Sequence, residues 1–313
     1  MPTNLPATEC SDQEGQMKEY KTTGRIIFNI FNYTFITLVL LLCLFPLIHI
    51  LALSFSSSAY TDANLVTLWP KGFTLAAYKY VIQNVKFWQS FGVTLKRLAF
   101  GVPINLILTI LAAYPLSKEE STFRGRKYYM GMFLFVMIFN AGLVPNYLLI
   151  KDLKLMDTIW ALVLPTGINV FNIVLMMNFF RGIPKEIEES ALVDGARQHV
   201  ILFRLFIPLA KPSIATITLF SFMSHWNAWM DGRIYMNNME NYPLQTYLQN
   251  VLESSDQVML NTVNLQSLID QMAVSGQNLR AAQLFVSIIP LLMIYPFLQK
   301  YFTTGLVMGS VKG

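Results

Sequence analysis

The residues best suited to carry chemistry lie in a short polar segment, 181–211, between two long uncharged stretches of the chain. Glu189, Ser190 and Ala191 follow one another there, and Gly195 comes after three further residues. An acid and two small side chains ahead of a glycine offer charge pairing and close contact rather than nucleophilic attack. Because glycine permits a sharp or left-handed turn, we predict a helix that turns at Gly195. An ordinary interhelical loop is the alternative.

The flanking residues support a compact helix–turn–helix in this segment. Pro184 suits the first helical turn, where its missing N–H costs nothing. Glu186 and Glu188 fall in the opening turns, where the positive end of the helix dipole favours acids. A second short segment, 197–206, carries apolar residues, and Pro208 is expected to open the next helix.

This spacing resembles the "EAA loop" of bacterial ABC importer permeases, which reads Glu-Ala-Ala, three residues, Gly, nine residues, then Ile-x-Leu-Pro. Ser190 replaces the first Ala, and Leu205 and Ile207 replace Ile and Leu. The resemblance implies a docking element for a separate ATP-hydrolysing subunit, in which Glu189 pairs with a basic group of that subunit. The residues so implied are Glu186, Glu189, Ser190, Ala191, Asp194, Gly195, Ala196 and Pro208.

The composition indicates a membrane protein. The chain is 54% hydrophobic and 13% charged, whereas soluble domains carry roughly 25% charged residues. A spanning helix needs about 20 apolar residues, and six uncharged stretches approach or exceed that length. We therefore predict an all-α integral membrane protein with six transmembrane helices, which the resemblance makes a type I ABC importer permease fold. The expected spans are about 26–55, 88–117, 128–150, 158–180, 209–230 and 281–301.

Basic residues give the orientation. With the N-terminus in the cytoplasm, fourteen Lys/Arg lie inside, seven outside, and Lys96 and Arg97 are ambiguous. Cytoplasmic loops carry the Lys/Arg excess, so both termini are predicted to be cytoplasmic in a bacterial cell (inner) membrane. Residues 1–24 then form a cytoplasmic tail before the permease domain, 25–313. Within that domain, residues 181–208 form the cytoplasmic coupling loop and residues 231–280 form an external segment. The bases bracket the spans, so no nucleic-acid partner is expected.

Polar residues within the spans are candidates for a substrate path, although such residues also join neighbouring helices. The preferred cluster is His225 with Asn227 and Trp229, because amide and indole edges suit sugars. The candidates are Asn140, Asn169, Asn172, Ser221, Ser224, His225, Asn227, Trp229, Lys96 and Arg97.

Lys96 and Arg97 have two interpretations. Ionisable groups inside a membrane are costly and tend to face a cavity or the interface. The pair is expected to extend to the outer membrane surface, and the sharper hypothesis is that it attracts an acidic sugar.

The chain has no phosphate-binding loop, metal-protease motif, nucleophile elbow or paired-cysteine metal site. No catalytic residue, metal or bound cofactor is therefore expected, and ATP and Mg²⁺ belong to a partner subunit. The spans contain no Asp or Glu, which disfavours an ion-coupled carrier, and the scarcity of histidine disfavours an intramembrane enzyme.

The C-terminus and the stretch around Trp226 and Asn227 resemble carbohydrate-uptake permeases of the maltose-transporter type, most of all those for complex oligosaccharides and alginate. In that family the tail reaches the ATPase subunits, which implicates Gly309, Val311 and Lys312. The expected function is the permease of an oligosaccharide importer, with an acidic sugar as one option and a non-sugar solute as the alternative. The implied partners are a sister permease, two ATPase subunits, an extracytoplasmic solute-binding protein and the lipid bilayer.

Overall fold

The computed structural model describes residues 23–139, 141–253 and 276–310, and all regular elements within those ranges are helices. Its chain divides into two units, 1–48 and 49–313. By length and composition, three helices in the described ranges could each cross a membrane. They are α1 (Thr23–Ser54), α4 (Val85–Ser117) and the first part, 276–294, of α16 (Gly276–Ser310).

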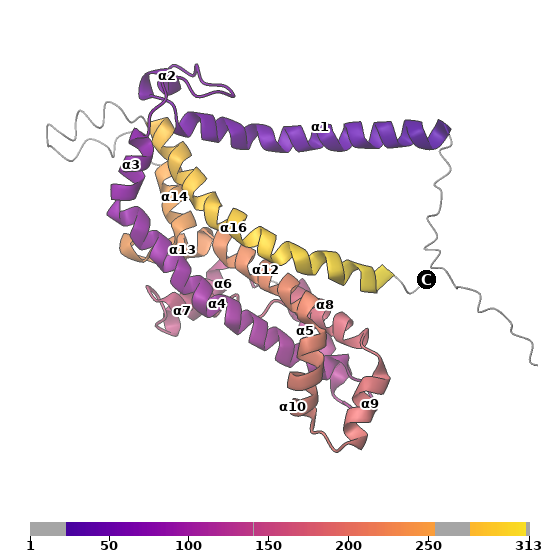
Figure 1. Cartoon of the computed structure of the whole chain (residues 1–313). Coiled ribbons are helices and arrows are strands. Elements are labelled where there is room, and N and C mark those ends of the chain that lie inside the picture. Colours follow the sequence, from indigo (N-terminus) through magenta and orange to yellow (C-terminus); the bar gives the residue numbers. More distant parts are fainter. Residues whose placement is uncertain (1–22, 140, 254–275, 311–313) are drawn as a thin grey trace, which may run out of the picture. The chain divides into compact units, whose positions relative to one another are not determined.

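Helix α4 is the axis of the second unit. It spans 33 residues, and Asn84 caps its start by accepting a hydrogen bond from the backbone N–H of Phe87 at 3.2 Å. It packs against α8 (Val170–Arg181) and α12 (Lys211–Asn227), and α12 in turn packs against α16. Figure 1 shows α9 (Lys185–Val193) and α10 (Gln198–Ile201) at the end where α4 finishes, and α3 (Ala76–Gln83) where it begins.

Separate apolar clusters stabilise the two ends of this unit. At the α9 end, buried side chains of α4, α8, α10 and α12 pack together, among them Phe180, Ile201 and Ile217. At the other end, α3, α4, α12, α14 (Leu244–Glu253) and α16 meet around Phe87 and Trp226. The helices α4, α8 and α12, which carry several of the candidate residues, are therefore held by packed cores.

Two predicted spans each contain two helices instead of one. The stretch 128–150 holds α5 (Arg126–Ile138) and α6 (Leu143–Asp152), and 158–180 holds α7 (Ile159–Val163) and α8. The second break contains Pro165 and Gly167, and proline cannot supply a helical N–H. Asn169 then caps α8, its side chain accepting from the N–H of Asn172 at 3.2 Å.

The remaining elements are short and lie in the segments between the long helices. They are α2 (Ser58–Asp62), the π-helix η1 (Leu202–Phe206), α11 (Ile207–Leu209), α13 (Met230–Tyr235) and the 3-10 helix η2 (Met239–Asn241).

Asp157 anchors the turn after α6. Its carboxylate accepts hydrogen bonds from the backbone N–H of Asn237 at 2.6 Å, the side chain of Asn237 at 2.9 Å and the backbone N–H of Asn238 at 3.1 Å. One acid thus connects two segments distant in sequence. Because these hydrogen bonds outweigh partial burial, the pKa of Asp157 lies below its ordinary value.

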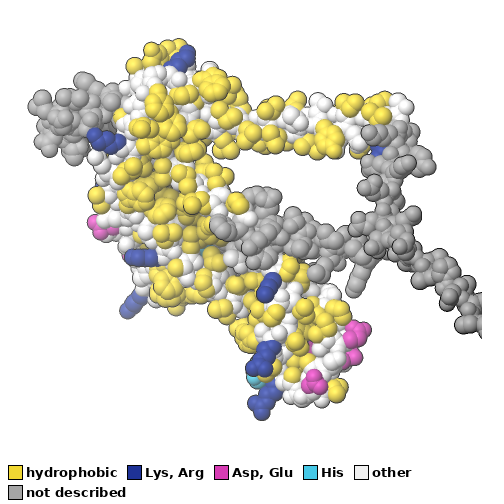
Figure 2. All heavy atoms as spheres, in the orientation of Figure 1, with side chains coloured by type: hydrophobic (Ala, Val, Ile, Leu, Met, Phe, Trp, Pro, Cys, Tyr) yellow, Lys and Arg dark blue, Asp and Glu magenta, His cyan; other side chains and the backbone are white. Residues whose placement is uncertain are grey.

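Figure 2 shows hydrophobic side chains over the middle of the second unit and charged side chains at the α9 and α10 end. Acidic side chains gather on the α9 side of that end, and basic side chains with a histidine on the α10 side.

Candidate functional site: a docking segment joined to a buried polar network

In the docking segment, residues 181–208, helix α9 ends where predicted but begins one residue late, because Pro184 precedes the first turn instead of lying in it. Pro184 stands directly before its first residue with φ −55° and ψ 133°, and Glu186 and Glu188 lie in the first turn. At the other end Gly195 has φ +76°, in the region that glycine occupies most readily. The turn at Gly195 is confirmed.

Hydrogen bonds at the end of α9 explain the spacing of the motif. The N–H of Ala196 donates to the carbonyl of Ala191 at 2.9 Å, and the N–H of Gly195 donates to that of Leu192 at 3.0 Å. These are the two bonds of a Schellman motif, which often includes an apolar contact between the same two outer positions. Ala191 and Ala196 both pack against the cluster that surrounds Ile201. The interval between alanine and glycine therefore sets where α9 stops.

The second half of the segment differs from the prediction. We expected Pro208 to open a helix, but it lies inside continuous helical structure from Gln198 to Leu209. The bend of 81° comes after Leu209, before α12. Proline lacks the N–H for a normal helical bond, and the π-helical turn η1 ends two residues before it. Wider turns of this kind accommodate such irregularities within helices.

The outward surface of α9 carries both charge and apolar area. Glu186, Glu189, Ser190 and Asp194 are exposed, and Val193 has 88% of its surface exposed. On the α10 side, Arg197, His199 and Arg204 are exposed. The exposed acids of α9 and the exposed bases of the α10 side therefore belong to the same end of the molecule.

The inner side of the segment is tied to the end of α4. The ammonium of Lys118 lies 2.6 Å from Oε1 of Glu188, and the two side chains are only 9% and 20% exposed. The same ammonium lies 4.0 Å from the ring centre of Tyr114 and 4.3 Å from that of Phe206. The Tyr114 hydroxyl donates to Gln198 at 2.7 Å. Burial lowers the pKa of Lys118, and Glu188 offsets part of that effect.

Two arginines donate hydrogen bonds to a backbone carbonyl in the last turn of α4. Arg126 Nε donates to the Leu116 carbonyl at 3.1 Å, and Arg181 donates to the same oxygen at 3.2 Å. Cations at a helix C-terminus are favoured by the dipole. An exposed ion pair between Lys185 and Glu119 adds a further link from α9 to the segment after α4.

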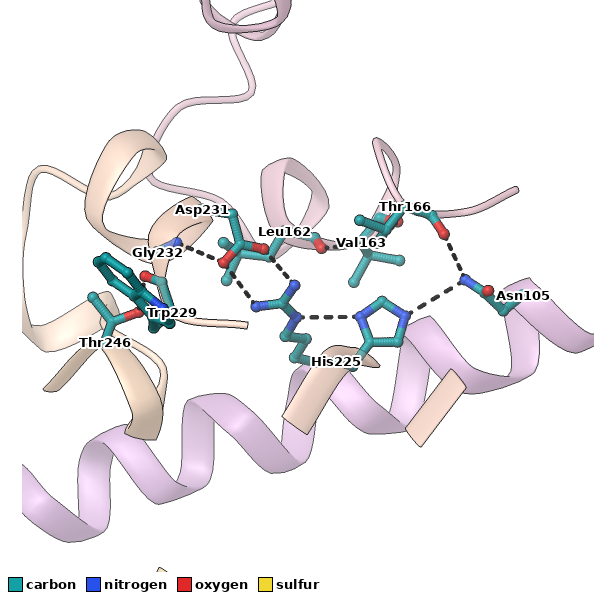
Figure 3. A network of polar contacts seen from close by, with 10 residues as sticks. Asn105, Leu162, Val163, Thr166, His225, Trp229, Asp231, Gly232 and Thr246 are labelled. Carbon is teal, nitrogen blue, oxygen red and sulfur yellow. Dashed lines mark hydrogen bonds and ion pairs between the residues drawn. The ribbon is translucent and has the colours of Figure 1, made fainter. Parts of the chain in front are cut away.

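Farther along α4, a buried polar network joins α4, α7, α12 and α13 (Figure 3). Arg97 forms an ion pair with Asp231, with one hydrogen bond of 3.1 Å from NH1 to Oδ1. Arg97 Nε also donates to His225 Nδ1 at 3.2 Å. The other ring nitrogen of His225 lies 3.5 Å from Asn105, which donates to the Thr166 carbonyl at 2.8 Å.

The close approach of α4 and α12 at this network needs a glycine. A Cβ on Gly101 would lie 2.5 Å from His225 Nε2. Ser221, one turn before His225 on α12, donates to Asn105 Oδ1 at 3.5 Å. The network thus occupies the contact between two packed helices rather than an open surface.

The expectation that Lys96 and Arg97 both reach the membrane surface is wrong for Arg97. The Arg97 side chain is fully buried, although Lys96 is exposed. Helix α4 starts at Val85, so both residues lie well inside it, and Arg97 is on its buried side. Because Asp231 neutralises Arg97, an acidic sugar would have to compete with that ion pair. Asp231 could have been found from the sequence, because an arginine buried in a span needs a carboxylate partner and Asp231 directly follows a predicted span.

The other path candidates differ in burial. Of the preferred cluster, His225 is buried, Trp229 is half-buried and Asn227 is exposed. Ser224 and Asn169 are exposed, and Asn172 is buried. Gly309 lies in α16, whereas Asn140, Val311 and Lys312 lie outside the described residues. The structure adds Asn105, Asp231, Lys118 and Glu188 to the candidate site.

Comparison with known proteins places this architecture in a class of membrane transport permeases. Residues 102–307 match the family described as binding-protein-dependent transport system inner membrane component. The chain belongs to this family, whose members are integral membrane subunits of ABC importers with the type I permease fold, and ATP is hydrolysed by a separate subunit.

Relatives and a solved structure match nearly the whole chain. It is 36% identical over 294 residues to protein LplC of Bacillus subtilis (strain 168), covering 94% of this chain and 98% of the relative. It is 35% identical over 291 residues to the polygalacturonan/rhamnogalacturonan transport system permease protein YtcP of the same organism, covering 92% and 99%. A chain in the crystal structure of a bacterial ABC transporter involved in import of the acidic polysaccharide alginate is 35% identical, with TM-score 0.81, covering 90% and 99%.

Proposed function

We propose that this chain is the permease subunit of an importer for acidic oligosaccharides derived from polysaccharides. The observation that carries this proposal is the likeness, over at least 90% of the chain, to a permease named for polygalacturonan and rhamnogalacturonan and to an alginate importer. The proposal does not rest on Arg97, because that charge is already paired with Asp231.

The assembly that we propose contains a sister permease as a heterodimer partner, two ATPase subunits that bind ATP and Mg²⁺, and an extracytoplasmic solute-binding protein. Both termini of this chain face the cytoplasm, since that orientation gives the cytoplasmic loops the Lys/Arg excess. The tail residues Gly309, Val311 and Lys312 extend toward the ATPase subunits.

The segment 181–208 docks on an ATPase subunit in this proposal. Its support is the exposed surface of α9, where Glu189 and Val193 lie side by side along a helix that a Schellman motif ends. Glu189 pairs with a basic group of the ATPase, and Val193 enters an apolar depression. Closure of the ATPase pair on ATP then moves the segment and shifts the permease between inward- and outward-facing states.

The docking role is tested by purifying the transporter from its native membrane in mild detergent. Glu189→Lys reverses an exposed charge on α9, and Glu120→Lys makes the same change at another exposed acid near the end of α4. We expect Glu189→Lys to lose the ATPase and retain the sister permease, while Glu120→Lys retains both. ATPase retained at the wild-type level in Glu189→Lys would contradict the proposal.

The substrate class is tested by comparing the uptake of acidic and neutral oligosaccharides. Oligogalacturonides and neutral malto-oligosaccharides of equal length are compared for binding-protein-dependent uptake in cells that carry the complete transporter. We expect uptake of the acidic set and weak or no uptake of the neutral set. Preference for the neutral set would remove the acidic class and leave the docking role unaffected.

A further inference from the structure

The cytoplasmic end of α4 contacts each part of the docking segment. Glu188 of α9 reaches Lys118, Gln198 of α10 reaches the Tyr114 hydroxyl, and Phe206 of η1 packs against both Lys118 and Tyr114. Three pieces of one segment therefore converge on a single turn of α4.

Lys118 is the centre of this convergence. Its ammonium is enclosed by a carboxylate and two aromatic rings and is 9% exposed. Cation–π contacts and charged hydrogen bonds strengthen when water is excluded. A lysine at the end of a membrane helix would otherwise extend freely into water.

The same helix holds the buried network at its other half. Arg97 of α4 pairs with Asp231 of α13 and donates to His225 of α12. Lys118 follows Arg97 by 21 residues, which is about 32 Å along a helix at 1.5 Å per residue. Helix α4 thus contacts the docking segment at its C-terminal end. About 32 Å before that end, it contacts the break between α12 and α13.

We infer that Lys118 is the positioning residue that makes α9 and α4 move as one body, so that displacement of the docking segment reaches the Arg97–Asp231–His225 network. This inference rests on the docking role of 181–208 proposed above. Without the Lys118–Glu188 contact, the exposed Lys185–Glu119 pair and the apolar cluster still hold α9 in place, so it still docks, but a smaller part of its displacement reaches α4 and α13.

Amide hydrogen exchange of the whole transporter tests this transmission without requiring a known substrate. Exchange is compared without nucleotide and with ATP bound to hydrolysis-deficient ATPase subunits. In the wild type we expect ATP to change the exchange of both α9 and α13. In Lys118→Met we expect the change in α9 to persist and most of the change in α13 to be lost.

Matched variants separate positioning from general damage. Lys127→Met removes a cation of an exposed ion pair with Glu120 and should behave as the wild type. Lys118→Arg keeps the charge and should restore the change in α13. Glu188→Gln removes the negative charge that pairs with Lys118 at constant volume and should reproduce the Lys118→Met result. The test therefore remains valid if one variant folds poorly.

Each outcome decides between the two proposals. A wild-type ATP effect on α13 that persists in both Lys118→Met and Glu188→Gln would overturn the inference while the docking role stands. An equal loss in Lys127→Met, or no rescue by Lys118→Arg, would also overturn it. Absence of any ATP effect on α9 in the wild type would overturn the docking role itself, and the inference with it.

Discussion

Arg97 and Asp231 form an ion pair between residues 134 positions apart in the chain, and the arginine side chain has no exposed surface. The pair binds the break after α12 to the middle of α4. Because His225 accepts from the remaining Nε of Arg97, most of the guanidinium's donor capacity is used within the protein.

Removing one member of the pair should destabilise the protein more than removing both. Arg97→Met or Asp231→Asn alone leaves an unpaired buried group, and breaking a buried pair costs about 3–5 kcal/mol. The double variant Arg97→Met/Asp231→Asn should recover part of that loss. Thermal unfolding of the purified complex measures the effect, with the exposed Lys96→Met as the control. Equal melting temperatures for all four variants would show that the ion pair contributes nothing to stability.

A methyl group at Gly101 should separate α4 from α12. The added Cβ would lie 2.5 Å from the His225 ring, and overpacking of this kind costs about 1–3 kcal/mol. Gly92→Ala on the same helix is the matched control, because a Cβ there meets nothing within 4 Å. We expect Gly101→Ala to lower the melting temperature and Gly92→Ala to leave it unchanged or raise it. The reverse order would contradict the helix contact described here.

The turn at the end of α9 should depend on backbone conformation alone. Gly195 has φ +76°, and a Cβ there meets no atom within 4 Å. Gly195→Ala should therefore cost about 1–2 kcal/mol through the left-handed conformation, while Gly195→Asn should cost less. Retention of the ATPase subunit in pull-downs at increasing detergent gives the readout. Equal retention by Gly195→Ala and the wild type would show that docking does not need a glycine at this turn.

The turn anchored by Asp157 should loosen in acid. Hydrogen bonds from Asn237 and Asn238 place the folded pKa of Asp157 below its ordinary value of 3.8. Such a group contributes stability above its unfolded pKa, and this contribution is lost as the pH falls through the folded pKa. We expect amide exchange of residues 236–241, corrected for intrinsic rates, to be protected at pH 5–7 and to lose protection below about pH 4. Asp157→Asn should remove this pH dependence, and if the variant retains it, another group is responsible.

The sequence predicted the docking segment well because its structure is local. Pro184, the acids after it and Gly195 act within one helix and one turn, so spacing alone indicates where α9 ends. Pro208 does not open a helix because helical structure already runs through it from Gln198, with the π-helical turn η1 just before it, and no residue pattern in the segment signals that turn.

The buried network could be predicted only in part. Arg97 and His225 were recognised as unusual residues within spans, but their partners Asp231 and Asn105 come from other segments. Pairing across 134 positions depends on how α12 bends into α13, which is a tertiary property. The contact between Lys118 and Glu188 was missed for the same reason, since each residue alone is typical of a cytoplasmic loop.

The most direct test of the account measures whether import requires ATP hydrolysis by a separate subunit. The purified transporter is placed in proteoliposomes with its solute-binding protein, and entry of oligogalacturonides is followed with ATP or ADP supplied to the ATPase side. We expect uptake with ATP and none with ADP, and no uptake when the complex carries Glu189→Lys. Equal uptake with ADP, or with the ATPase subunits absent, would contradict it.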